Sequence, residues 1–215
     1  RPLAGRGQPG PTAAHGRVAA AAGTVAGAGA DAHDEPVVVA PTVPVGVSAG
    51  HRAFEGTRAV SPDTFRAYVT ETVESLASHG LDRVVVVNGH GGNVDALREA
   101  CAGLTRAGTA VTVPFTWFEA ADLGPPMGHG GPRETALLRA VRPDLVREDR
   151  VKAAAAGAAA RWGEARSGAD LADDVAPVSE NGVVGDPRAG DPELRERRLA
   201  AGSRTPGRPR RGGWA

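Results

Sequence analysis

The sequence of 215 residues contains little cysteine and no long apolar run. Cys101 is its only cysteine, so neither an intrachain disulfide nor a cysteine-based zinc site is expected, and a reducing compartment fits best. No segment approaches the roughly 20 apolar residues of a membrane helix, and the first residues lack the apolar core of a secretory signal. These absences predict a cytoplasmic protein that does not span a membrane.

The sequence also lacks a net charge, because 25 Lys and Arg residues balance 25 Asp and Glu residues. No overall field therefore draws the molecule toward nucleic acid or an anionic bilayer. The local exception is the segment 203–215, where four arginines stand among Gly and Pro without an acid. Such a tail can contact phosphates, but a short basic end is more often solvated, so nucleic acid is not an expected partner.

The distribution of large apolar residues divides the chain into three parts. Residues 1–36 are rich in Ala and Gly, so we expect a degenerate or poorly packed N-terminal segment. Residues 37–201 carry strand and helix patterns and are predicted to form one α/β domain, and a chain that is 41% hydrophobic can give this domain a core. Residues 202–215 are predicted to be a disordered tail rich in Arg, Gly and Pro.

Apolar runs alternate with helical periodicities between residues 37 and 201. Strands are predicted at 37–40, 83–87 and 110–115, and the four consecutive valines 84–87 predict burial on both faces of their strand. Helices are predicted at 62–79, with Ser61 as N-cap, at 94–106 and at 132–140, and weaker signals lie at 151–161 and 191–201. This order predicts a three-layer α/β/α sandwich with a mostly parallel central sheet.

The segment directly after the strand at 83–87 reads NGHGGN (88–93). Ligands bind beyond the carboxyl ends of strands in open α/β sheets, which makes His90 a candidate metal or substrate contact. The glycines remove side chains around this histidine, and Asn93 is placed to cap the following helix. A glycine-rich turn with an incidental histidine explains the same residues, and the motif alone does not decide between the two.

A second group of candidates is HGGPRET (129–135). Its glycines again clear space beside a histidine, and Glu134 falls in the first turn of the next predicted helix. An imidazole and a carboxylate held in this way suit a metal ligand with a general acid or base beside it. Helix capping and the helix dipole also favour a glutamate at this position, so Glu134 has a structural explanation that His129 does not have.

Three segments together resemble the creatininase family of metal-dependent amidohydrolases. They read VGVSAGHRAFEGT (45–57), VVVVNGHGGN (84–93) and HGGPRET (129–135), the last with RPDLV (142–146) behind it, and they occur in the family's order and spacing. The stretch NGVVGDP (181–187) is similar to one near the end of many members. The resemblance covers about residues 37–201 and implies a three-layer α/β/α fold that usually assembles into homo-oligomers.

The resemblance also implies a chemistry. Members hold two divalent ions, which are zinc, manganese or iron, and a metal-activated water attacks an amide-type carbon. Relatives open the creatinine ring, deformylate a pyrimidine intermediate or trim the mycofactocin precursor peptide, so the expected substrate is a small cyclic amide or a formamide.

Carried over by position, His90 is a metal ligand, His129 handles protons, and Glu134 is a metal-binding or catalytic carboxylate. The residues that would bind the substrate are His51, Phe54, Asn88, Gly91, Gly92 and Trp117.

The sequence departs from the family near its beginning. Members carry Gly-Ser-x-Glu-x-His-Gly where this chain reads GPTAAHG (10–16), so Ala13 replaces a glutamate ligand while His15 remains as a metal ligand. The aspartate that bridges the two metals falls on or near Thr24. Without that carboxylate, two cations would repel each other with nothing to neutralise them.

Three hypotheses follow from this departure. The chain is a metal-dependent amidohydrolase, or it is a catalytically impaired member that serves as a binding or assembly subunit. The third is that residues 1–33 and the residues from 203 onward reflect a shifted reading frame in GC-rich DNA, because they are unlike the middle of the chain.

Overall fold

The computed structural model describes residues 37–119, 127–163, 165–166, 169–170 and 174–190. In the first of these ranges, strand β1 (Arg83–Asn88) pairs in parallel with strand β2 (Val111–Thr116), so that Asn88 lies opposite Thr116. Helix α2 (Pro62–Ala77) precedes β1, and helix α3 (Val94–Arg106) connects the two strands. The predicted α/β class and parallel sheet are confirmed.

Helix α2 begins at the predicted residue because its first turn is capped. The Ser61 hydroxyl accepts a hydrogen bond from the Thr64 N–H at 3.2 Å, and Pro62 occupies the first helical position. Phe65, Val69 and Val73 recur at helical spacing and are buried. The helix ends at Ala77, and the chain then turns at Gly80, whose φ of 85° lies in the left-handed region that favours glycine.

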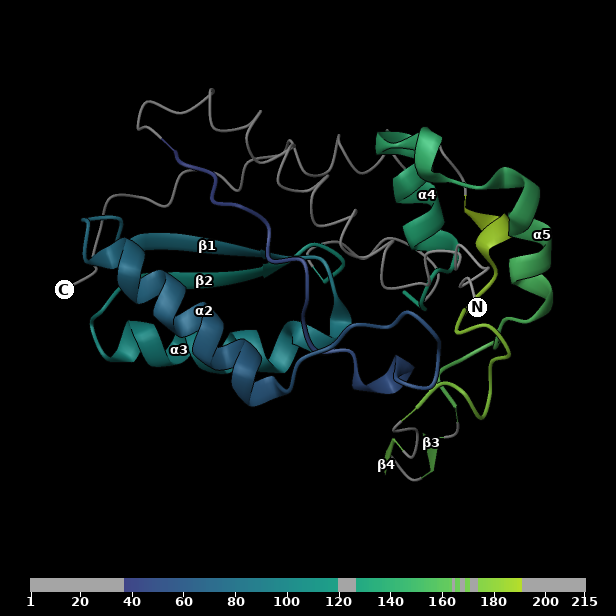
Figure 1. Ribbon diagram of the computed structural model, residues 1–215, viewed down its shortest axis with the longest axis horizontal. Helices are drawn as coiled ribbons and strands as arrows, with labels where there is room; N and C mark the ends of the chain where they lie inside the picture. The colour runs from purple at the N-terminus through teal and green to yellow at the C-terminus, as the bar shows by residue number, and fades with distance from the viewer. Residues whose placement is uncertain (1–36, 120–126, 164, 167–168, 171–173, 191–215) are drawn as a thin grey trace, which may run out of the picture.

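Helices α2 and α3 cover the same face of the strand pair, as Figure 1 shows. Two core clusters lie between the helices and the strands, one formed by Val47, Phe65, Val69, Ala96, Leu97 and Ala100 and the other by Val73, Leu104 and Ala110. Val84 and Val86 of β1 pack against these clusters, whereas Val85 points to the opposite face and is 64% exposed. The expectation that the valines are buried on both faces is therefore wrong at Val85 and at Val87, which is also exposed.

The expectation of a strand at residues 37–40 is also wrong. These residues form no strand, and their three valines are exposed, with Val38 at 72%. Pro41 and Pro44 remove backbone donors just beyond them, so neither a hydrogen-bond ladder nor burial stabilises a strand here. The run of valines has strand propensity, but propensity alone does not form a strand.

The rest of the described chain holds helix α4 (Pro132–Val141), the 3-10 turn η3 (Pro143–Leu145), helix α5 (Glu148–Ala156) and the 3-10 turn η4 (Pro187–Ala189). The short strands β3 (Ala165–Arg166) and β4 (Ala169–Asp170) form an antiparallel pair. Arg139 of α4 joins these parts, because it donates to Glu148 at 2.7 Å and to the Gly190 carbonyl at 2.7 Å.

Helix α5 begins three residues before the predicted Val151 and ends at Ala156, and the helix predicted at 191–201 lies outside the described residues. None of the helices in the described ranges has both the length and the apolar character needed to cross a membrane.

Candidate functional site

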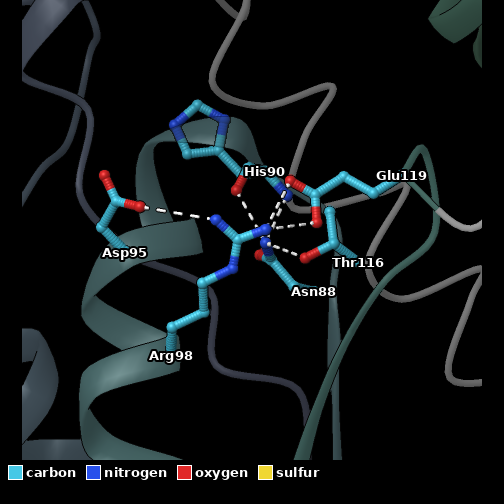
Figure 2. Close-up of polar contacts among 6 residues, drawn as sticks. All are labelled: Asn88, His90, Asp95, Arg98, Thr116 and Glu119. Carbon is cyan, nitrogen blue, oxygen red and sulfur yellow. Dashed lines mark hydrogen bonds and ion pairs between the residues drawn. The ribbon is translucent and has the colours of Figure 1, made fainter.

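The NGHGGN loop leaves the carboxyl end of β1 as predicted, and the Asn88 side chain organises it. Asn88 is buried, and its side-chain amide donates to the His90 carbonyl at 3.0 Å and to the Thr116 hydroxyl at 3.2 Å. Its oxygen accepts a hydrogen bond from the His90 N–H at 3.1 Å. Figure 2 shows this side chain between the ends of the two strands. Asn88 thus fixes the backbone from which His90 projects, a role distinct from the substrate contact predicted for it.

A second loop is held against this one through both backbone groups of Val47. The Val47 N–H donates to Asn93 Oδ1 at 2.8 Å, and the Val47 carbonyl accepts from His90 Nε2 at 2.8 Å. Asn93 occupies the predicted N-cap position of α3, but its side chain makes no capping bond and instead contacts Val47. Gly46 and Gly92 allow the close approach: a Cβ at Gly92 would lie 2.3 Å from the Val47 oxygen.

The contact with Val47 also fixes the proton on the His90 ring. A carbonyl oxygen only accepts hydrogen bonds, so Nε2 must carry the hydrogen that it donates. In neutral His90, Nδ1 is then the acceptor nitrogen. Histidines that bind metals commonly donate their other ring N–H to a carbonyl or a carboxylate in this way. The ring is half-buried, and Figure 2 shows it pointing away from the Arg98 guanidinium.

His129 sits in a small ladder formed by three chain segments. Its N–H donates to the Val184 carbonyl at 2.9 Å, and the Val184 N–H donates back at 2.8 Å. The same Val184 forms a parallel bridge with Ala159. Glycines at 128 and 131 allow this approach, since a Cβ at either position would come within 2.5 Å of the Val184 oxygen. His129 is only 3% exposed, so the ladder holds a buried imidazole.

Glu134 lies in the first turn of α4 and is 4% exposed. Its carboxylate accepts a hydrogen bond from the Gly130 N–H, and the Thr135 hydroxyl donates to the Gly130 carbonyl at 3.4 Å. The N-cap of α4 is Gly131, so this contact lies one residue before the bond of a capping box, while the carboxylate still stands in the first turn, where the helix dipole favours it. The carboxylate thereby ties the loop that carries His129 to the start of α4.

His51 and Phe54 reach His129 from a distant part of the chain. His51 ends the 3-10 turn η1 (Ala49–His51), and its ring stacks on the His129 ring with centroids 3.7 Å apart and an interplanar angle of 36°. His51 Nε2 donates to the Gly182 carbonyl at 3.1 Å, and the Phe54 ring lies 5.9 Å from the His51 ring. Two buried imidazoles with an aromatic neighbour therefore form one cluster.

Trp117 follows β2 and is only partly buried. Its ring stands edge-on to that of Phe118 at 5.6 Å, and the backbone N–H of Trp117 donates to the Asn88 carbonyl at 3.5 Å. Arg98 Nη2 donates hydrogen bonds to both carboxylate oxygens of Glu119, at 3.2 Å to Oε1 and 3.0 Å to Oε2. Figure 2 shows this ion pair. Trp117 thus lies beside the NGHGGN loop, and the Arg98 ion pair joins its segment to α3.

The predicted residues fall into two groups that the loop 46–51 connects. Asn88 and His90 form one group, while His51, Phe54 and His129 form the other. Gly91 and Gly92 begin the 3-10 turn η2 (Gly91–Asn93) beside the first group. His15 lies outside the described residues. Trp162, which the sequence gave no reason to select, stands 6.0 Å from the His129 ring, and no local signal pointed to it.

The described residues alone do not assemble a metal centre. Within the ranges that the structure describes, no group of three or more His, Cys, Asp or Glu side chains is placed to hold an ion. His90 has the hydrogen bond expected of a ligand, but it is not part of such a group within those ranges. A site with two ions would require further ligands.

Comparisons with known proteins point to one family. A family model described as creatininase, creatinine amidohydrolase, matches residues 3–204. The mycofactocin precursor peptide peptidase of Mycolicibacterium smegmatis is 38% identical over 174 residues, which are 80% of this chain and 66% of that protein. The creatinine amidohydrolase of Pseudomonas putida is 34% identical over 123 residues, which are 48% of this chain and 47% of that protein. The chain thus spans less than two thirds of the length of these curated relatives.

Solved structures agree with the fold. A tryptophan-to-phenylalanine mutant of creatininase is 27% identical with a TM-score of 0.53, and the match covers 71% of this chain and 64% of that chain. A creatinine amidohydrolase structure that is 24% identical has a TM-score of 0.50 and covers 92% of this chain and 82% of that chain.

Proposed function

Because the chain belongs to the creatininase family, we propose that it is a hydrolase that cleaves an amide carbon–nitrogen bond. The observation that carries the proposal is the family match over residues 3–204, which contains both histidine motifs. The proposed substrate is peptide-like, because the similarity to mycofactocin precursor peptide peptidases extends over 80% of the chain and that to creatinine amidohydrolase over 48%. A small cyclic amide or a formamide is the second substrate class.

The proposed proton-handling group is His129. It is buried against His51, and the His51 N–H that points to Gly182 leaves the other nitrogen of the neutral His51 ring as an acceptor. A positioned imidazole that moves a proton to or from the reacting atoms contributes roughly a hundredfold to ten-thousandfold in rate. Glu134 supports this arrangement by holding the Gly130 N–H and thereby the loop of His129.

A divalent ion is also part of the proposal, with zinc, manganese and iron as candidates. When bound, such an ion would polarise the amide carbonyl as a Lewis acid and would lower the pKa of a coordinated water toward neutral pH. His90 is the proposed ligand, through Nδ1, because its Nε2 is engaged by the Val47 carbonyl. The described residues do not complete the site, so no reaction step is assigned to the ion. His15 is proposed among the remaining ligands.

The test combines metal analysis with a panel of amides. The purified full chain is assayed with short peptides, creatinine and a formamide, beside the variants His129→Ala, His90→Ala and His79→Ala. His79 is an exposed histidine after α2 and serves as the matched control. We expect turnover of a peptide amide that falls at least about a hundredfold in His129→Ala and is unchanged in His79→Ala. We also expect bound metal that is lost in His90→Ala.

A second candidate function is a binding or assembly subunit without catalysis. Two observations favour it. In the described ranges, no three metal-ligating side chains come together. In the sequence, Ala13 and Thr24 stand where family members carry metal-binding carboxylates. Binding of an amide without turnover, and without bound metal, would support it over the hydrolase. Turnover that requires His129 would exclude it.

The oligomeric state, the domain bounds and the cellular location are also proposals. We propose a homo-oligomer with one α/β domain at 37–201, flanked by the segments 1–36 and 202–215. A cytoplasmic location stays a prediction that depends on the single cysteine. The arginine-rich residues 203–215 lie outside the described residues, and nucleic-acid binding by them stays a hypothesis that a deletion of this segment would test.

A further inference from the structure

The backbone ladder at Val184 places Trp162 next to His51 and His129, which are called the histidine pair below. The Ala159 N–H donates to the Val183 carbonyl at 2.9 Å, and the Gly185 N–H donates to the Ala159 carbonyl at 2.8 Å. Ala159 and His129 therefore pair with the same stretch of chain, and Trp162 follows Ala159 by three residues. Backbone hydrogen bonds thus set where the indole lies.

The indole stands upright against both imidazoles. Its ring is 5.7 Å from the His51 ring at an interplanar angle of 90°, and 6.0 Å from the His129 ring at 65°. Both histidines are 3% exposed, whereas Trp162 is 41% exposed. The indole is therefore an accessible aromatic surface in contact with the two buried rings.

The core does not account for this position of the indole. The neighbouring cluster consists of Ala159, Val175 and Val184, with Phe54 packed against it, and Trp162 is not a member. Because 41% of Trp162 stays exposed to water, a substantial part of the free energy that full burial of the side chain would supply is not gained. A ligand that covers the exposed part of the indole would recover some of this free energy.

We propose that Trp162 is a specificity-determining residue that binds a planar, aromatic group of the substrate beside the histidine pair. The inference deepens the proposed function and rests on it, since it places the substrate next to His129. Indole surfaces favour aromatic rings because their quadrupoles attract in offset-stacked and edge-to-face geometries. A saturated ring of similar size gains burial but not this attraction, so the two kinds of group can be distinguished.

The test uses peptides that differ only in the planarity of one side chain. N-acetyl-Gly-Gly-Phe amide and N-acetyl-Phe-Gly-Gly amide are each compared with the same peptide in which cyclohexylalanine replaces phenylalanine. Calorimetry on the full chain measures binding, and release of amine measures hydrolysis. The variants are Trp162→Leu, which removes the aromatic ring, Trp162→Phe, which keeps one, and Tyr68→Leu as a control at an aromatic residue on α2 that is 54% exposed.

We expect at least one phenylalanine peptide to bind about three- to tenfold more tightly than its cyclohexylalanine partner. This ratio should fall to about one in Trp162→Leu, remain largely intact in Trp162→Phe, and be unchanged in Tyr68→Leu. If hydrolysis occurs, Trp162→Leu should raise KM for the phenylalanine peptide with little change in kcat, whereas Trp162→Phe and Tyr68→Leu should leave both largely unchanged, because the proposed role of the indole is to bind the substrate and not to transfer a proton. Thermal unfolding of each variant separates a loss of binding from a loss of folding.

The outcomes distinguish this inference from the proposed function. Binding that prefers the planar group and requires Trp162, but without hydrolysis, supports the inference and overturns the hydrolase proposal. Hydrolysis with the same preference in Trp162→Leu as in the parent chain supports the hydrolase proposal and overturns the inference. The inference is also overturned if the parent chain binds none of the peptides or binds both kinds equally.

Discussion

Replacing Gly92 by alanine tests the contact between the NGHGGN loop and Val47. A Cβ at this position would lie 2.3 Å from the Val47 carbonyl oxygen and 2.9 Å from His90 Nε2. Favourable contacts between heavy atoms lie near 3.5 Å, so the Val47 carbonyl would have to move by about 1 Å. The backbone at Gly92 does not require glycine for its φ, and the close approach alone is tested.

The expected loss follows from the two hydrogen bonds that this movement breaks. They join Val47 to His90 at 2.8 Å and to Asn93 at 2.8 Å. Each contributes about 0.5–1.5 kcal/mol net, so roughly 1–3 kcal/mol is lost. Alanine recovers about 0.4–1 kcal/mol by restricting the unfolded chain. We therefore expect Gly92→Ala to lower the free energy of unfolding by an amount between about 0 and 2.6 kcal/mol, with a central value of roughly 1.3 kcal/mol.

Gly91→Ala is the matched control, because it adds the same methyl group one residue earlier. A Cβ there meets only the Phe118 ring, at an ordinary 3.9 Å. We expect this variant to be neutral or slightly stabilised, by less than about 1 kcal/mol. Urea unfolding of both variants gives the comparison, and hydrogen exchange at the Val47 amide reports the bond to Asn93. Equal stabilities for the two variants, or an unchanged exchange rate in Gly92→Ala, would refute the reasoning.

Three further predictions concern stability and reactivity. The hydrogen bond from Arg139 lowers the pKa of the Glu148 carboxyl, so its contribution is present above the unfolded pKa of about 4.3 and is lost as the pH falls. The deficit in unfolding temperature of Glu148→Gln should accordingly shrink between pH 6 and pH 3, and a constant deficit would contradict this. Burial raises the pKa of the Cys101 thiol, which is 1% exposed, so a thiol reagent should label it only on unfolding; rapid labelling of the native chain would be the contrary result. Leu97→Ala removes a side chain that is 2% exposed and should cost about 2–5 kcal/mol in urea unfolding, whereas Leu81→Ala, at 43% exposed, should cost far less. Similar losses for the two would count against the assigned core.

Local patterns in the sequence determined the elements that depend on nearby residues. The start of α2 follows from Ser61 and Pro62, and its buried face follows from the spacing of Phe65, Val69 and Val73. The valines of β1 predicted a parallel strand, and the position of His90 at the end of that strand followed from the chain order. These features required only neighbouring residues, because caps and periodicities act within a turn or two.

Two local patterns failed because the tertiary structure did not support them. Valines 37–39 resemble a buried strand but are exposed, because no burial accompanies their propensity. Asn93 is a suitable cap for α3, yet its side chain binds the Val47 N–H. In each case the local preference amounts to about 1 kcal/mol, so the lack of burial at the valines and the distant contact of Asn93 are enough to override it.

By itself, the sequence determined the α/β class, the spans of α2 and α3, the family and the histidines that became candidates. Only the tertiary structure decided how they meet: Asn93 binds a residue 46 positions away, and His51 donates to a carbonyl 131 positions away. The stack of His51 on His129 and the approach of Trp162 likewise depend on the ladder at Val184 and on glycines that let backbones come close. Local preferences act over a few residues, whereas a site built from separate segments exists only once the packing of the chain has brought those segments together.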